Sequence, residues 1–176
     1  MGDVSTLKDY LPLIGVAVGG LLVIIGGFAS NTLLEYFRER KVRRTLALAF
    51  WGEVQALLKI IEERGYIEGL RKAKAHIEAT GKFKAYQVRA QNRHFSVFEA
   101  NVGQIGILGS PLSELIFRFY SQAKSIIEGM ERFDEFNPAT VDPVVAIAAY
   151  DEVLGIFEDT VAVGNRIIKE VSRYYL

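Results

Sequence analysis

The sequence lacks cysteine altogether and contains only two histidines, His76 and His94. Without cysteine the chain can form no disulfide, no thiolate zinc site and no cysteine nucleophile. Two imidazoles leave little material for a metal centre. The net charge is zero, from 21 basic and 21 acidic residues, and so does not indicate whether a partner would be acidic or basic. These absences exclude several classes of small enzyme and metalloprotein.

Patterns typical of enzymes are also missing. His94 and Glu99 are five residues apart, off the i, i+4 face of a helix, and no H-E-x-x-H motif occurs. Gly103, Gly106 and Gly109 repeat every third residue, but a phosphate-binding loop would need G-K-[ST], so close helix packing explains them better. We therefore predict a non-enzymatic protein with no catalytic, cofactor-binding or metal-binding residues and no evident small-molecule substrate.

Charge is absent from one long stretch, Tyr10–Leu34, which lies between Asp9 and Glu35. Its 25 residues exceed the roughly 20 that a helix needs to cross a bilayer. Gly27-Phe28-Ala29 resembles a signal-peptide cleavage site, but the run is too long and its N-terminal flank too weakly basic for a signal peptide. The sequence predicts a transmembrane helix at residues 10–34 after an external tail, residues 1–9.

The flank that follows this run is basic. It contains Arg38, Arg40, Lys41, Arg43 and Arg44. Because basic flanks stay in the cytoplasm, residues 35–176 are predicted to be cytosolic and the N-terminus external, in a bacterial inner membrane. The five basic side chains are also predicted to contact anionic lipid headgroups.

Small residues recur within the same run. Gly15 and Gly19 form a G-x-x-x-G pair, and Gly26 and Ser30 extend it. Small residues let helix backbones approach, so these four predict lateral association with another copy or with a larger membrane complex. The alternative is that glycine is simply frequent in membrane helices.

Apolar spacing of three and four residues predicts helices over most of the remaining chain. They span residues 31–64, 66–80, 111–133 and 143–174, with Gly65 and Gly81 as stops and Ser110-Pro111 and Asp142-Pro143 as starts. No segment alternates convincingly as a strand. The predicted fold is all-α: one transmembrane helix followed by an antiparallel bundle of three or four main helices.

Opposite charges are segregated along the chain. Residues 71–94 have a net charge of +6, and residues 128–159 have a net charge of −8. The basic residues are Arg71, Lys72, Lys74, Lys82, Lys84, Arg89 and Arg93. The two segments could pair with each other or be merely solvated, or the basic one could bind an acidic partner or headgroups. Nucleic acid is disfavoured because no nucleic-acid-binding motif accompanies the basic residues.

The segment Phe98-Glu99-Ala100-Asn101, followed by Ile105-Gly106-Ile107-Leu108-Gly109-Ser110-Pro111-Leu112 and Ile116-Phe117-Arg118-Phe119-Tyr120, carries a resemblance. It is similar to uncharacterised small bacterial and phage-borne proteins with one membrane span and a helical cytosolic domain. The resemblance implies that topology and no activity.

Together these patterns predict a membrane-anchored, non-enzymatic interaction or assembly subunit. It would associate through its glycine-rich span and present charged helical faces to a partner. The alternative is an oligomeric effector that perturbs the membrane, such as a small pore or a phage-exclusion protein.

Overall fold

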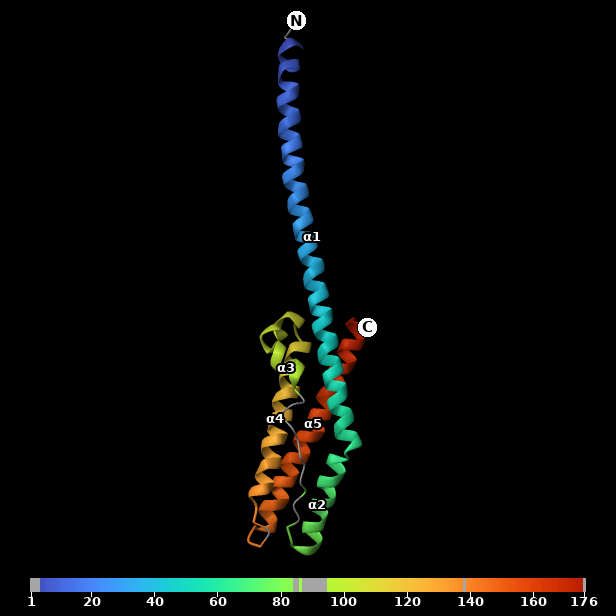
Figure 1. Ribbon diagram of the computed structural model, residues 1–176, viewed down its shortest axis with the longest axis vertical. Helices are drawn as coiled ribbons and strands as arrows, with labels where there is room; N and C mark the ends of the chain where they lie inside the picture. Colours follow the sequence, from blue (N-terminus) through green and yellow to red (C-terminus); the bar gives the residue numbers. More distant parts are fainter. Residues whose placement is uncertain (1–3, 84–85, 87–94, 138, 176) are drawn as a thin grey trace. The chain divides into compact units, whose positions relative to one another are not determined.

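All regular secondary structure in the described residues is helical, which confirms the all-α prediction. The computed structural model describes residues 4–83, 86, 95–137 and 139–175, with the side chains of 4–19, 21–31 and 134 outside the description. The elements are α1 (Val4–Glu63), α2 (Tyr66–Thr80), α3 (Ser96–Asn101), the 3-10 helix η2 (Val102–Leu108), α4 (Leu112–Glu135) and α5 (Pro143–Tyr175) (Figure 1). The chain divides into two compact units, Met1–Arg43 and Arg44–Leu176.

Glycines set the bounds of α2. Gly65 and Gly81 have φ angles of 61° and 65°, a left-handed conformation that residues with a Cβ rarely adopt. The Gly81 N–H donates to the Ile77 carbonyl at 2.7 Å. The predicted bounds of this helix, residues 66–80, are therefore confirmed.

The two proline-marked starts behave differently. Asp142 caps α5, because its Oδ1 accepts the Val144 N–H at 2.8 Å. Ser110 does not cap α4: its hydroxyl donates to Glu114 Oε1 at 2.7 Å, and α4 begins after Pro111. The cap prediction is thus confirmed for α5 and wrong for α4.

The membrane prediction needs correction. Among the residues searched, which are those the structure describes, no helix is both long and apolar enough to cross a bilayer. The described side chains of α1 from Thr32 to Arg44 include seven charged residues, which interrupt any apolar stretch there. This finding contradicts the predicted single-pass inner-membrane localisation. The lipid-headgroup role of the five basic side chains is not tested by it and stays a prediction. The side chains of Gly15, Gly19, Gly26 and Ser30 lie outside the description.

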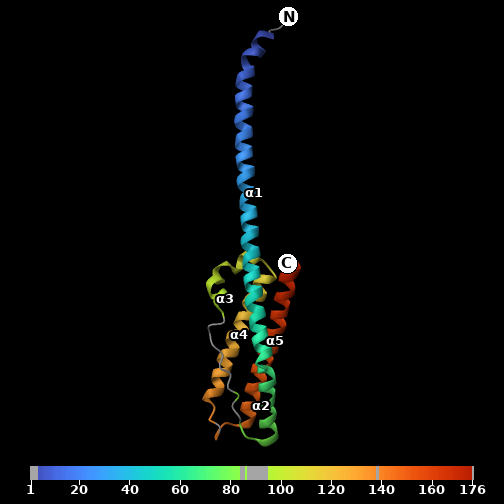
Figure 2. The same ribbon diagram turned by 45° about the vertical axis from the view of Figure 1, so that its right-hand side comes forward.

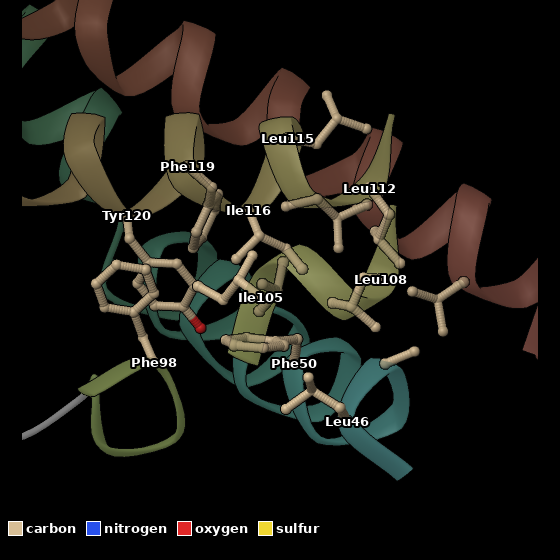
Figure 3. Packing of buried hydrophobic residues seen from close by; sticks show 14 of the residues in the cluster. Leu46, Phe50, Phe98, Ile105, Leu108, Leu112, Leu115, Ile116, Phe119 and Tyr120 are labelled. Atoms are coloured by element: carbon tan, nitrogen blue, oxygen red, sulfur yellow. The ribbon is translucent and has the colours of Figure 1, made fainter. Parts of the chain in front are cut away.

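The α4–α5 hairpin carries two hydrophobic cores in the unit Arg44–Leu176. The first half of α4 and the second half of α5 pack with α1, α3 and η2 around Phe50, Phe119 and Ile167 (Figure 3). The other halves pack with α2 around Leu70 and Tyr150. Figures 1 and 2 show α2 continuing beyond the end of α1, alongside α5. The antiparallel bundle therefore consists of α4, α5 and a third column. The C-terminal part of α1 and then α2 follow one another along this third column.

Close helix packing occurs at glycines other than the predicted ones. A Cβ on Gly164 of α5 would lie 2.9 Å from Phe119 Cε2, and one on Gly129 of α4 would lie 2.8 Å from Val153 Cγ2. A Cβ on Gly103, Gly106 or Gly109 would meet nothing within 4 Å. The packing interpretation of that glycine repeat is wrong.

Candidate interaction surfaces

Glu53 of α1 joins α3 and α4 in the first core. Its Oε1 accepts the Val97 N–H at 2.7 Å, and its Oε2 accepts the Phe98 N–H at 3.1 Å. The Ser96 hydroxyl is 3.3 Å from Oε1, and the Tyr120 hydroxyl donates to Oε2. The carboxylate thus occupies the position of a helix cap for α3, supplied from another helix. Its acceptor capacity is used inside the fold.

The Tyr120 side chain is fully buried beside the Glu53 carboxylate. Its ring stacks on Phe98 with centroids 4.2 Å apart and meets the edges of Phe50 and Phe95 (Figure 3). Burial, followed by the hydrogen bond to Glu53 and the carboxylate charge, raises the pKa of Tyr120 far above its usual range. A phenol that stays protonated holds Glu53 in place and offers no acid–base chemistry near neutral pH.

A similar aromatic arrangement lies in the second core. Tyr150 stacks on Phe133 with centroids 4.3 Å apart, and its hydroxyl accepts the Tyr86 N–H at 3.1 Å. Burial raises the pKa of Tyr150, and the Tyr86 hydrogen bond partly offsets this. The Tyr86 ring lies so close to Gly69 that a Cβ there would be 2.2 Å from its Cζ. Both tyrosines therefore serve packing between segments distant in sequence.

The predicted basic patch is partly paired within the chain. On α2, Lys74 contacts Asp151 of α5 at 2.6 Å, and Arg71 contacts Glu158 of α5. The hydrogen bond to Asp151 is the largest cause that raises the pKa of Lys74. Lys72 pairs with Glu68 at 3.3 Å. The first alternative, pairing between the basic and acidic segments, thus holds for Arg71 and Lys74.

Four basic residues of the predicted patch remain. Lys82 is exposed after the end of α2, and Lys84, Arg89 and Arg93 lie outside the described residues. Recruitment of a partner by this patch stays a prediction.

The exposed part of α1 carries a mixed surface. Leu33, Leu34 and Phe37 are 58%, 66% and 56% exposed, and Arg40 and Lys41 are exposed beside them. At 3.6 residues per turn these five side chains fall within roughly a third of the helix circumference. Glu35 and Glu39 fall on the opposite side. We name Leu33, Leu34, Phe37, Arg40 and Lys41 the apolar–basic face.

No ion pair within the described residues involves the predicted cluster Arg38, Arg40, Lys41, Arg43 and Arg44. All five side chains are exposed. The stretch 33–44 has five basic and two acidic residues, a net charge of +3. Exposed apolar side chains and positive charge without an ion pair among the described residues therefore coincide on this stretch.

The α4–α5 turn carries the opposite combination. Glu128, Glu131 and Glu135 are exposed and, at spacings of three and four, share one face of α4. Val144 and Val145, at the adjoining start of α5, are 73% and 54% exposed. Asp142 is exposed beside them. We name Glu128, Glu131, Glu135, Asp142, Val144 and Val145 the acidic–apolar end.

The residues considered for chemistry lie apart or outside the description. His76 and Glu99 are exposed on α2 and α3, and His94 is not described. Asn101 is half-buried and donates to the Val97 carbonyl at 2.8 Å. In the part of the chain searched, no three His, Asp or Glu side chains gather as a metal site.

Comparisons of the chain with protein-family models, with curated proteins and with solved structures find no match. The resemblance noted for the segment 98–120 stays a prediction.

Proposed function

We propose that this chain is a non-enzymatic interaction or assembly subunit that binds a protein partner through the apolar–basic face of α1. The observation that carries the proposal is the exposure of Leu33, Leu34 and Phe37 on consecutive turns of one helix beside Arg40 and Lys41. Single exposed apolar residues are ordinary on a protein surface. Several on one face, rimmed by charge, mark a binding surface.

Helix energetics support the same proposal. Most of the stability of a helix in a protein comes from packing of its apolar face, not from intrinsic propensity. The stretch 32–45 of α1 is exposed at every position, whereas Ala47 and Phe50, only a few residues further along, are fully buried. A partner on the apolar–basic face supplies the packing that this stretch lacks.

The chain's internal contacts support an interaction role over an enzymatic one. The buried tyrosines and Glu53 are occupied by structural hydrogen bonds. Arg71 and Lys74 are paired with α5. Among the described residues, the exposed groups that remain available include surface charges and apolar side chains.

The test replaces Leu33 and Phe37 together by Gln, a good helix former. Cross-linking in the source cells, followed by purification of the full chain, measures the fraction held in complexes of fixed stoichiometry. We expect this double variant to lose about nine-tenths or more of the complexed fraction, because a few residues carry most of the binding energy of an interface.

The matched control replaces Tyr36 and Val42 by Gln. Both are exposed on the same helix, at 58% and 42%, but lie off the apolar–basic face. The control should leave the complexed fraction unchanged. Equal loss in both variants, or a wild-type chain with neither a partner nor a second copy bound, contradicts the proposal.

A further inference from the structure

The acidic–apolar end complements the apolar–basic face of the same chain. The stretch 33–44 has a net charge of +3, whereas residues 128–142 contain five acidic residues and one basic residue, a net charge of −4. Each surface also carries exposed apolar side chains: Leu33, Leu34 and Phe37 on one, Val144 and Val145 on the other. Opposite charge together with exposed apolar side chains on both surfaces is a general feature of a specific protein interface.

Three of the four acidic side chains of the acidic–apolar end have no ion pair within the described part of the chain, and the fourth, Asp142, caps α5. Glu128, Glu131 and Glu135 take part in no ion pair among the described residues. Four acidic residues of α5 behave differently, because Asp151, Glu152, Glu158 and Asp159 each have a basic partner. The three glutamates on the exposed face of α4 are thus available to an external cation.

We infer that the apolar–basic face of one chain docks on the acidic–apolar end of a second copy. This inference rests on the proposed function and names its partner. Two copies pairing through their apolar–basic faces alone would bring two stretches of charge +3 together, which charge repulsion opposes. Docking on the acidic–apolar end neutralises both. Because the two surfaces differ, each chain donates one and accepts on the other, and the contact is head-to-tail.

Sedimentation velocity of the purified full chain tests the inference. A non-ionic detergent is kept at one concentration in every sample, so that any association driven by the uncharged run Tyr10–Leu34 is the same for wild type and for the charge variants. The wild-type chain should associate with increasing concentration, and the association should weaken with added salt because exposed charges are screened.

Charge reversal then identifies the surfaces. One variant carries Arg40→Glu and Lys41→Glu, and a second carries Glu131→Lys and Glu135→Lys. All four side chains are exposed, so both variants should fold as judged by circular dichroism. Each alone should weaken association about tenfold or more. An equimolar mixture of the two should restore it, because each reversed surface then meets its complement.

A matched control carries Arg166→Glu and Lys169→Glu, both at exposed positions on α5. This control should associate as the wild type does. Loss of association in the α1 variant but not in the α4 variant overturns the inference, and so does a mixture that stays monomeric.

A wild-type chain that stays monomeric at all concentrations also overturns the inference. If such a chain still holds another protein that the Leu33→Gln/Phe37→Gln variant loses, the proposed function survives with a different partner. If it holds none, both fail.

Discussion

At Glu53 one carboxylate connects a helix to two segments that follow much later in the chain. Its partner Tyr120 is 67 residues away in sequence. The hydrogen bond is largely removed from water, and bonds of this type to a charged group contribute about 1.5–3 kcal/mol. Because Glu53 also binds two N–H groups of α3, losing the tyrosine hydroxyl should loosen the α3 contact as well.

Replacing Tyr120 by Phe should therefore lower the free energy of unfolding by about 2 kcal/mol. Urea denaturation followed by circular dichroism measures this change. Replacing Tyr174 by Phe, where the ring is 63% exposed, is the control and should have no effect. An unchanged urea midpoint for the Tyr120 variant would show that the Glu53 contact contributes nothing.

The same residue predicts a pH dependence. Burial holds the pKa of Tyr120 above its unfolded value, which is about 10. Its contribution is therefore complete below about pH 10 and falls as the pH rises further, because the unfolded phenol ionises and the folded one does not. The difference in urea midpoint between wild type and Tyr120→Phe should shrink from pH 9 to about pH 11. A difference that grows with pH would contradict this assignment.

Among the elements, α5 shows how one glycine fixes the approach of three helices. A Cβ on Gly164 would lie 2.9 Å from Phe119 of α4 and 3.0 Å from Leu58 of α1. A Cβ on Gly155 of the same helix meets nothing within 4 Å. Alanine at Gly164 and alanine at Gly155 can therefore be compared, which separates the packing cost of a methyl group from its effect on helix propensity.

We expect Gly164→Ala to destabilise the protein by about 1–3 kcal/mol, because an extra methyl group overfills a packed contact. Gly155→Ala should instead stabilise it by up to about 1 kcal/mol, through helix propensity alone. Thermal and urea unfolding of both variants check the prediction. Equal shifts of the same sign would mean that Gly164 does not govern the contact.

Elements were predictable from sequence where local chemistry decides them. Glycines with positive φ fix both ends of α2, and the Asp142 side chain fixes the start of α5. The inward stripe of α4, from Leu112 through Met130, follows from its periodicity. Contacts between distant segments were not predictable: nothing near Glu53 or Tyr150 in sequence marks the groups they bind. The predicted membrane span shows a different limit, because an uncharged run alone does not establish where a helix lies.

Viewed as a whole molecule, the unit Arg44–Leu176 has two cores joined by α4 and α5. Phe50 lies in one core and Leu70 in the other, and both are fully buried. Because α4 and α5 run through both cores, a substitution that destabilises one core should also destabilise the other.

Phe50→Ala and Leu70→Ala should each lower the free energy of unfolding by about 2–5 kcal/mol. Both should shift one shared transition when scanning calorimetry and circular dichroism are compared. Two separate transitions, each moved by only one of the variants, would show that the cores fold independently.

The basic side chains of the apolar–basic face and the glutamates of the acidic–apolar end lie on different helices. The amount of a variant chain mixed with wild type therefore affects the length of a head-to-tail series. A head-to-tail series is polar: it has one terminal chain with a vacant helix and another with a vacant turn. A chain carrying Glu131→Lys and Glu135→Lys could still dock its own α1 on the vacant turn, but its reversed turn could not receive the α1 of a further chain. That variant would act as a chain terminator. Mixed with wild type at much less than one variant per wild-type chain, it would already shorten the series.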